Sequence, residues 1–223
     1  MNDDPHAGQP VLEHGSPLSD ARLAVILVHG RGGSPDAMIA LARDLVVADV
    51  AYFAPSASGG TWYPYSFLAP IHQNEPGLSS GLRVLSQLVD MIARNGLPHE
   101  RVALLGFSQG ACLALEFAAR HARRYAGVIG LSGGIIGPPG APRAYTGWFD
   151  DTPIFLGCSD VDSHVPLERV HESADVFRRL GAAVDERIYP QMGHLINQDE
   201  LDAVKALLAN AAREAIDDSR QPQ

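Results

Sequence analysis

Lysine, cysteine and long apolar runs are all scarce in this chain. Lys205 is the only lysine among 17 basic residues, which face 26 acidic ones, so the formal net charge is -9. Such an acidic chain lacks the basic footprint that nucleic acid or an anionic membrane requires. No run approaches the roughly 18 apolar residues of a membrane span, and no basic and apolar leader opens the chain. We therefore expect no nucleic-acid partner, no stable membrane anchor and no signal peptide.

The two cysteines, Cys112 and Cys158, both lie in apolar surroundings. A disulfide framework or a zinc site needs more ligands at closer spacing. We therefore expect buried free thiols in a cytoplasmic protein, with no metal and no cofactor. The composition, 46% hydrophobic and 19% charged, is that of a globular chain. We predict a loose lead-in over residues 1–20, a single domain over 21–216 and a frayed tail over 217–223.

Two periodicities alternate along the chain. A continuous apolar run predicts a strand buried on both faces over residues 22–29, and a second buried strand is predicted over 101–107. Further strands are predicted over residues 50–54, 126–131, 153–157 and 183–189. Amphipathic patterns with capping residues predict helices from Ser34, over 78–92 and 111–121, from Pro166, and over 199–215. This alternation is typical of an α/β protein, with a mostly parallel open sheet and helices on both faces. In such sheets the chemistry gathers at the C-terminal ends of the strands.

A nucleophile motif stands at the end of the third predicted strand. Gly106-Phe107-Ser108-Gln109-Gly110 matches G-x-S-x-G, and a helix follows it directly. That context is what a nucleophile elbow needs, because the turn lifts the hydroxyl above the sheet at a helix N-terminus. The second match, around Ser132, leads into a loop rich in glycine and proline. Ser108 is therefore our candidate nucleophile.

A serine hydroxyl needs a base, and the chain has nine histidines. His194 follows the last predicted strand and so lies on the same edge of the sheet as Ser108. We interpret His29 as a structural residue and expect His6 at the surface. Two carboxylates, Asp160 and Asp162, follow the fifth predicted strand, and either is placed to orient the imidazole.

The first predicted strand ends in a glycine-rich turn, His29-Gly30-Arg31-Gly32-Gly33. Such a turn lets backbone N–H groups approach an oxygen, and an oxyanion hole needs two of these donors. The amides of Arg31 and Gln109 are the candidates. The Arg31 side chain has two interpretations, attraction of an anionic substrate group or simple exposure to solvent.

Four ordered motifs together resemble the phospholipase/carboxylesterase family of α/β-hydrolases, which includes small bacterial carboxylesterases and acyl-protein thioesterases. They are HGRGG, GFSQG, the D-x-x-V-P run from Asp162 to Pro166, and the Gly-His pair at 193–194. The resemblance implies an α/β-hydrolase fold without a large cap. It also selects Asp162 as the catalytic acid, because the family's acid precedes x-x-V-P. Arg31 departs from the aliphatic residue usual in thioesterase members, which counts against long-chain or protein substrates.

The resemblance implies a serine carboxylesterase that acts on small-molecule esters of short to medium acyl length. Lysophospholipase or acyl-protein thioesterase chemistry on the same triad is the alternative, and monomer and homodimer both stay open. Without a cap, the pocket walls must come from the long loops at 55–77 and 133–151. Trp62, in the first of these loops, is the candidate pocket wall, and Leu195, next to His194, is a further candidate for substrate contact.

Overall fold

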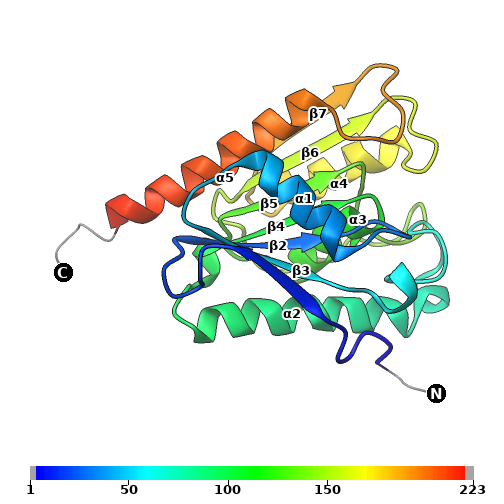
Figure 1. The fold of residues 1–223 in the computed structure, drawn as a ribbon. Helices are drawn as coiled ribbons and strands as arrows, with labels where there is room; N and C mark the ends of the chain where they lie inside the picture. Colours follow the sequence, from blue (N-terminus) through cyan, green and yellow to red (C-terminus); the bar gives the residue numbers. More distant parts are fainter. Residues whose placement is uncertain (1–3, 219–223) are drawn as a thin grey trace.

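The computed structural model describes residues 4–218, which form a seven-stranded sheet with helices on both faces (Figure 1). The strand order is β1-β3-β2-β4-β5-β6-β7, and only β1 with β3 is antiparallel. Residues 219–223 of the predicted tail lie outside the described residues. The elements are β1 (Val11–Gly15), β2 (Leu23–Val28), α1 (Pro35–Leu45), β3 (Val50–Pro55), α2 (Gly77–Arg94), β4 (Val102–Phe107), α3 (Gln109–Arg120), β5 (Gly127–Leu131), β6 (Pro153–Ser159), α4 (Leu167–Arg179), β7 (Ala183–Tyr189) and α5 (Gln198–Asp218).

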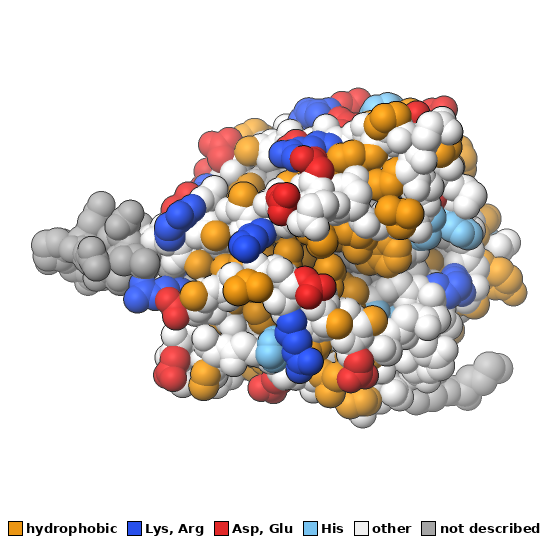
Figure 2. All heavy atoms as spheres, turned by 45° about the horizontal axis from the view of Figure 1, so that its top comes forward, with side chains coloured by type: hydrophobic (Ala, Val, Ile, Leu, Met, Phe, Trp, Pro, Cys, Tyr) orange, Lys and Arg blue, Asp and Glu red, His pale blue; other side chains and the backbone are white. Residues whose placement is uncertain are grey.

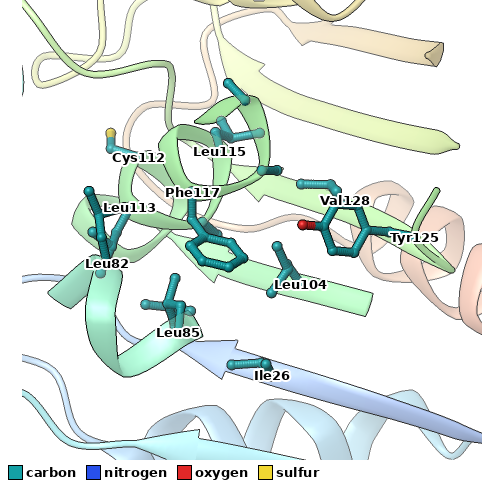
Figure 3. Close-up of a cluster of buried hydrophobic side chains, with 14 of the residues drawn as sticks. Ile26, Leu82, Leu85, Leu104, Cys112, Leu113, Leu115, Phe117, Tyr125 and Val128 are labelled. Carbon is teal, nitrogen blue, oxygen red and sulfur yellow. The ribbon is translucent and has the colours of Figure 1, made fainter. Parts of the chain in front are cut away.

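The sheet is buried on both faces from β2 to β6, whereas the residues of β1 and β7 are partly or fully exposed. In β2, Ile26 and Val28 face the layer of α2, α3 and α4, whereas Val25 and Leu27 face α1 and α5. Figure 3 shows the first of these clusters, where side chains of α2 and α3 pack over β2 and β4. Because the five strands from β2 to β6 are covered in this way, their C-terminal ends are held at one rigid edge.

Within the predicted loose lead-in, residues 1–3 lie outside the described residues, and residues 4–20 contain strand β1, which the sequence analysis did not predict. Most of β1 is partly or fully exposed, so it lacks the apolar run by which a doubly buried strand is recognised. His6, predicted at the surface, is only 3% exposed. Its ring bonds the Trp62 carbonyl and the Ser58 amide, and its own amide donates to the Ser80 hydroxyl. The N-terminal segment therefore packs against the long loop before α2.

Capping residues fix the starts of α1 and α5, and the first of these, Ser34, confirms the helix start predicted from the sequence. The Ser34 hydroxyl accepts a hydrogen bond from the Ala37 amide at the start of α1. Before α5, the Glu200 amide donates to Asn197 Oδ1 at 2.9 Å, and the Asn197 amide donates to Glu200 Oε2 at 2.8 Å. This reciprocal pair is a capping box, which satisfies two backbone donors that the helix itself cannot pair.

The capping carboxylate of Glu200 is fully buried, and its Oε1 has no hydrogen-bond partner among the described residues. Burial raises the pKa of Glu200 to about 7; the Asn197 amide opposes this rise and the charge of Asp199 adds to it. The folded protein thus binds the proton more tightly than the unfolded chain does. The contribution of Glu200 to the free energy of unfolding is fully present below its ordinary pKa near 4.5. It is lost as the pH rises through about 7.

Glu200→Gln is expected to remove this loss of stability, because the amide oxygen still accepts from Asn197 but cannot ionise. The shift corresponds to on the order of 3 kcal/mol at high pH. Melting curves at pH 5 and pH 8 should show a fall in Tm that is smaller in the variant by about 5 °C. Glu168→Gln, at an exposed site on α4, is the control. Equal falls in wild type and variant would contradict the assignment.

Acidic and basic side chains are interspersed on the face shown in Figure 2, and no continuous basic stretch crosses it. None of the helices in the described part of the chain combines the length and the apolar character needed to cross a membrane.

Candidate active site

Ser108 lies in the sharp turn between β4 and α3. Its backbone has φ 54° and ψ -120°, a conformation that L-residues adopt only under constraint from their surroundings. The constraint comes from close packing at two glycines. A Cβ on Gly106 would lie 2.3 Å from the Gly110 carbonyl oxygen, and one on Gly110 would lie 2.1 Å from the Val28 carbonyl oxygen. The flanking glycines of the motif therefore let α3 pack against the ends of β2 and β4.

The second G-x-S-x-G serine has a different environment. Ser132 also follows a strand with positive φ, 51°, but it is fully buried. Its hydroxyl faces the Leu195 carbonyl at 3.5 Å. A loop follows it in place of a helix, as the sequence indicated. Ser132 is therefore not presented to a substrate, whereas Ser108 lines an open pocket.

The structure brings Ser108, His194 and Asp162 together. His194 Nε2 lies 2.8 Å from Ser108 Oγ, and His194 Nδ1 lies 2.7 Å from Asp162 Oδ2. The carboxylate can only accept the Nδ1 proton, so Nε2 is left to accept the serine proton. The side chain of His194 is 19% exposed and that of Asp162 is fully buried. The three side chains therefore form a hydrogen-bonded line, in which the acid orients the base and the base contacts the hydroxyl.

The second oxygen of Asp162 accepts hydrogen bonds from the His164 and Val165 amides at 2.8 and 3.1 Å. Burial acts to raise the pKa of Asp162, but the hydrogen bonds from His194 and from these amides outweigh it and hold the pKa below its ordinary value. Asp160 instead accepts from the Gln191 amide. Of the two carboxylates that the residues alone left open, the structure thus places Asp162 beside the imidazole.

The amides of Arg31 and Gln109 border the same pocket as Ser108. Neither backbone N–H group donates a hydrogen bond to a backbone or side-chain acceptor within residues 4–218. Gln109 begins α3, where the first N–H groups have no partner in the helix and carry the positive end of its dipole. Both amides are therefore available to an oxygen placed next to Ser108.

The Arg31 side chain is exposed, and it also makes contacts that neither interpretation from sequence included. The guanidinium is held in one place beside the pocket by hydrogen bonds. Its two Nη atoms donate four hydrogen bonds of 2.8–3.0 Å to the loop that precedes α2. The sequence contains no signal for these contacts, because three of the four acceptors are backbone carbonyls.

His29 has the structural role that the sequence predicted. Its Nδ1 donates to the Gly30 carbonyl at 2.8 Å, and its Nε2 accepts from the Ala57 amide at 3.1 Å. Burial lowers the pKa of His29, so the ring stays neutral and keeps both bonds. The Trp62 ring packs against this ring at a tilt of 34°, and its indole N–H donates to the His29 carbonyl. Trp62 is fully buried, so it supports the site from beneath and does not form the pocket wall that we predicted.

A pocket of about 610 Å³ opens at Ser108. Leu195, predicted to touch substrate, is 47% exposed and lies outside this lining. The lining consists of Gly30, Arg31, Tyr63, Pro64, Tyr65, Ser66, Phe67, Phe107, Ser108, Gln109, Cys112, His164, Val165 and His194.

Two lining residues were not expected from the sequence. His164 meets the His194 ring edge to face, with 4.7 Å between centroids. Cys112 lies one helical turn after Ser108, and burial raises the pKa of its thiol to about 12, so it stays protonated and is no competing nucleophile. The position of Cys112 four residues after the nucleophile was a usable signal, because such residues share one helix face. Within residues 4–218 no group of three or more His, Cys, Asp or Glu side chains is arranged to hold a metal ion.

Comparison with known proteins agrees with this architecture. A solved phospholipase/carboxylesterase from Dyadobacter fermentans is 40% identical, with a TM-score of 0.87, over 90% of this chain and 96% of that one. An acyl-protein thioesterase 1 from Eremothecium gossypii is 26% identical over 84% of this chain and 87% of its own length. The acyl-protein thioesterase 1 of Gibberella zeae is 29% identical over 61% of this chain, which spans 59% of that protein.

The described residues have the α/β-hydrolase fold without a cap domain, and the chain is a serine ester hydrolase by family and by structural likeness. The sequence model for Phospholipase/Carboxylesterase matches residues 13–211. The chain therefore belongs to the phospholipase/carboxylesterase family.

Proposed function

We propose that this chain is a carboxylesterase that hydrolyses short- to medium-chain carboxylic esters of small molecules through an acyl-enzyme on Ser108. The observation that carries the proposal is the pair of contacts of His194, at 2.8 Å to Ser108 Oγ and at 2.7 Å to Asp162 Oδ2. A serine hydroxyl of ordinary acidity attacks a carbonyl only when a base takes its proton.

In the acylation step, Ser108 Oγ attacks the ester carbonyl carbon while His194 Nε2 takes the hydroxyl proton. Asp162 stabilises the imidazolium that forms, and it is fitted for this because its oxygens already accept bonds from His194, His164 and Val165. The tetrahedral intermediate collapses as the carbon–oxygen bond to the alcohol breaks, and His194 returns its proton to that oxygen.

In the deacylation step, His194 takes a proton from water, and the resulting hydroxide attacks the acyl carbonyl. The second tetrahedral intermediate releases the carboxylic acid, and the proton on His194 returns to Ser108 Oγ. In both steps the developing oxyanion lies between the Arg31 and Gln109 amides. These donors are fixed before the reaction begins, so they stabilise charge without reorganisation in the transition state.

The preference for short to medium acyl chains rests on the pocket walls. Tyr63, Tyr65 and Phe67 form one wall, Phe107 and Val165 also contribute, and no cap extends the groove. Leu195 is exposed outside the pocket lining, so the contact proposed for it is with a part of the substrate that extends beyond the pocket. The buried, unpaired thiols support a cytoplasmic location.

Acyl-protein thioesterase or lysophospholipase activity on the same triad is the second candidate. The relatives from Gibberella zeae and Eremothecium gossypii, both named acyl-protein thioesterase 1, favour it. A thioester carbonyl would use the same nucleophile and the same amides. The two candidates therefore differ in the length of chain that the pocket accepts.

The acyl-length profile tests this proposal. We expect kcat/KM for p-nitrophenyl esters to peak between acetate and hexanoate and to fall at decanoate. Acyl carbons beyond the pocket gain none of the about 0.8 kcal/mol of a buried methylene, and a chain that does not fit displaces the carbonyl from Ser108. The series runs from acetate to palmitate, with Ser108→Ala as the blank. A maximum at decanoate or beyond would favour the second candidate, and acylated cysteines and lysophospholipids would be assayed next.

A further inference from the structure

The Arg31 side chain is bound to one short segment, residues 61–65, which we call the strut. Its Nη1 donates to the Thr61 hydroxyl at 3.0 Å and to the Pro64 carbonyl at 2.9 Å. Its Nη2 donates to the Tyr63 and Tyr65 carbonyls at 2.9 and 2.8 Å. All four Nη hydrogens are therefore used, and every acceptor is neutral. The guanidinium acts here as a fork of fixed geometry, not as half of an ion pair.

The Gln109 side chain is bound to the same strut. Its Nε2 donates to the Tyr63 carbonyl at 2.8 Å, and its Oε1 accepts from the Trp62 amide at 2.9 Å. The side chain is buried, so these bonds are shielded from water. The same Oε1 lies 3.2 Å from the Thr61 hydroxyl. Arg31 and Gln109, whose backbone amides border the oxyanion position, thus both bind the strut through their side chains.

Thr61 connects the two sides. Its hydroxyl accepts from Arg31 and lies within donor range of Gln109 Oε1 and of the Tyr63 carbonyl, at 3.2 Å each. A hydroxyl has one proton and two acceptor positions, so it can accept from the guanidinium while it donates to the amide oxygen. A continuous chain of hydrogen bonds therefore runs from Arg31 through Thr61 to Gln109.

We propose that the strut sets the spacing of the oxyanion hole, and that Arg31, Thr61 and Gln109 are positioning residues through their side chains. The inference rests on the proposed function, because it requires the Arg31 and Gln109 amides to hold the oxyanion.

The need for such a strut follows from the turn that holds the Arg31 amide. Gly30, Gly32 and Gly33 flank this residue, and a Cβ on Gly32 would meet nothing within 4 Å. Cβ atoms on Gly30 and Gly33 would lie 3.3 and 3.0 Å from backbone oxygens, so packing limits these two positions. Packing does not limit Gly32, directly after Arg31, and a glycine without such contacts is conformationally free. Besides the guanidinium, one bond ties it to the loop, from the Gly32 amide to the Gly60 carbonyl at 2.8 Å. An oxyanion donor displaced by about 1 Å costs roughly 100-fold in rate.

The test uses Thr61→Val, which removes the bridging hydroxyl at nearly constant volume, together with Thr61→Ser, Arg31→Met and Arg31→Lys. We expect Thr61→Val to lower kcat about tenfold and Arg31→Met about 100-fold, with KM within about twofold, because the loss falls on the transition state. Arg31→Lys keeps the charge but cannot bind four acceptors from two nitrogens, and we expect it to resemble Arg31→Met. Thr61→Ser keeps the hydroxyl and should retain wild-type kcat.

A butyl trifluoromethyl ketone supplies the second readout, because it adds to a catalytic serine and leaves an oxyanion in the same position. Its inhibition constant should rise by the same factor as kcat falls, in each variant. Thr146→Val and Arg94→Met, at exposed sites away from the pocket, are the matched controls. Melting temperatures of all variants confirm that they are folded.

Three results would overturn the inference: a wild-type kcat in Arg31→Lys, a rise in KM at constant kcat, or an inhibition constant that does not follow kcat. Failure of the proposed function gives a different pattern, in which a fluorophosphonate does not label wild-type Ser108 and Ser108→Ala keeps its activity. The two failures are thus distinguished in the same set of assays.

Discussion

Ser108→Ala is expected to lower kcat/KM for p-nitrophenyl butyrate by about 10⁴-fold or more. Alanine removes the nucleophile but leaves the backbone amides, the pocket and His194 in place. The residual rate then comes from binding and from stabilisation of the oxyanion alone. Initial rates of wild type and variant, measured over a range of substrate concentrations, give kcat/KM directly.

Ser132→Ala is the matched control, since Ser132 stands in the second G-x-S-x-G match and also has a positive φ. Its hydroxyl is buried against the Leu195 carbonyl. We expect this variant to keep kcat/KM within about threefold of wild type, since a single neutral hydrogen bond contributes only about 1 kcal/mol. A Ser108→Ala variant within tenfold of wild type would remove Ser108 from the mechanism.

The contrast between these serines shows what the sequence was able to predict. Strand, turn and helix are local patterns, and Ser108 was chosen because a helix follows it directly. The five buried strands, β2 to β6, were predicted for the same reason, since an apolar run needs no knowledge of its partners. Strand β1 was missed because it lies at the edge of the sheet, where its mostly exposed residues give no such run.

The side chains of Arg31 and Trp62 show where local patterns stop being informative. Arg31 binds carbonyls about 30 residues away, and a carbonyl is present at every position of the chain. Trp62 fits between His6 and His29, which come from distant segments. Both arrangements depend on how the loop before α2 closes over the site. Long-range packing of this kind has no signature in residue type or spacing.

Asp162→Asn is expected to lower kcat by about 10³- to 10⁴-fold at neutral pH, with a much smaller change in KM. The amide is nearly isosteric with the carboxylate, so the bonds from the His164 and Val165 amides to Oδ1 can persist. An amide NH₂ placed against His194 Nδ1 can only donate. It therefore favours the tautomer with hydrogen on Nε2, which cannot take the proton of Ser108.

Asp160→Asn is the matched control, two residues away in the same loop. Asp160 Oδ1 accepts from the Gln191 amide at 2.8 Å, and an asparagine oxygen accepts the same bond. We expect kcat of this variant within about twofold of wild type, because a single neutral bond replaces a single charged one at an exposed site. Steady-state rates of both variants, with melting curves to show that each is folded, decide between the two carboxylates. A large loss in Asp160→Asn with a near-normal Asp162→Asn would mean that the loop rearranges when substrate binds and exchanges the two acids.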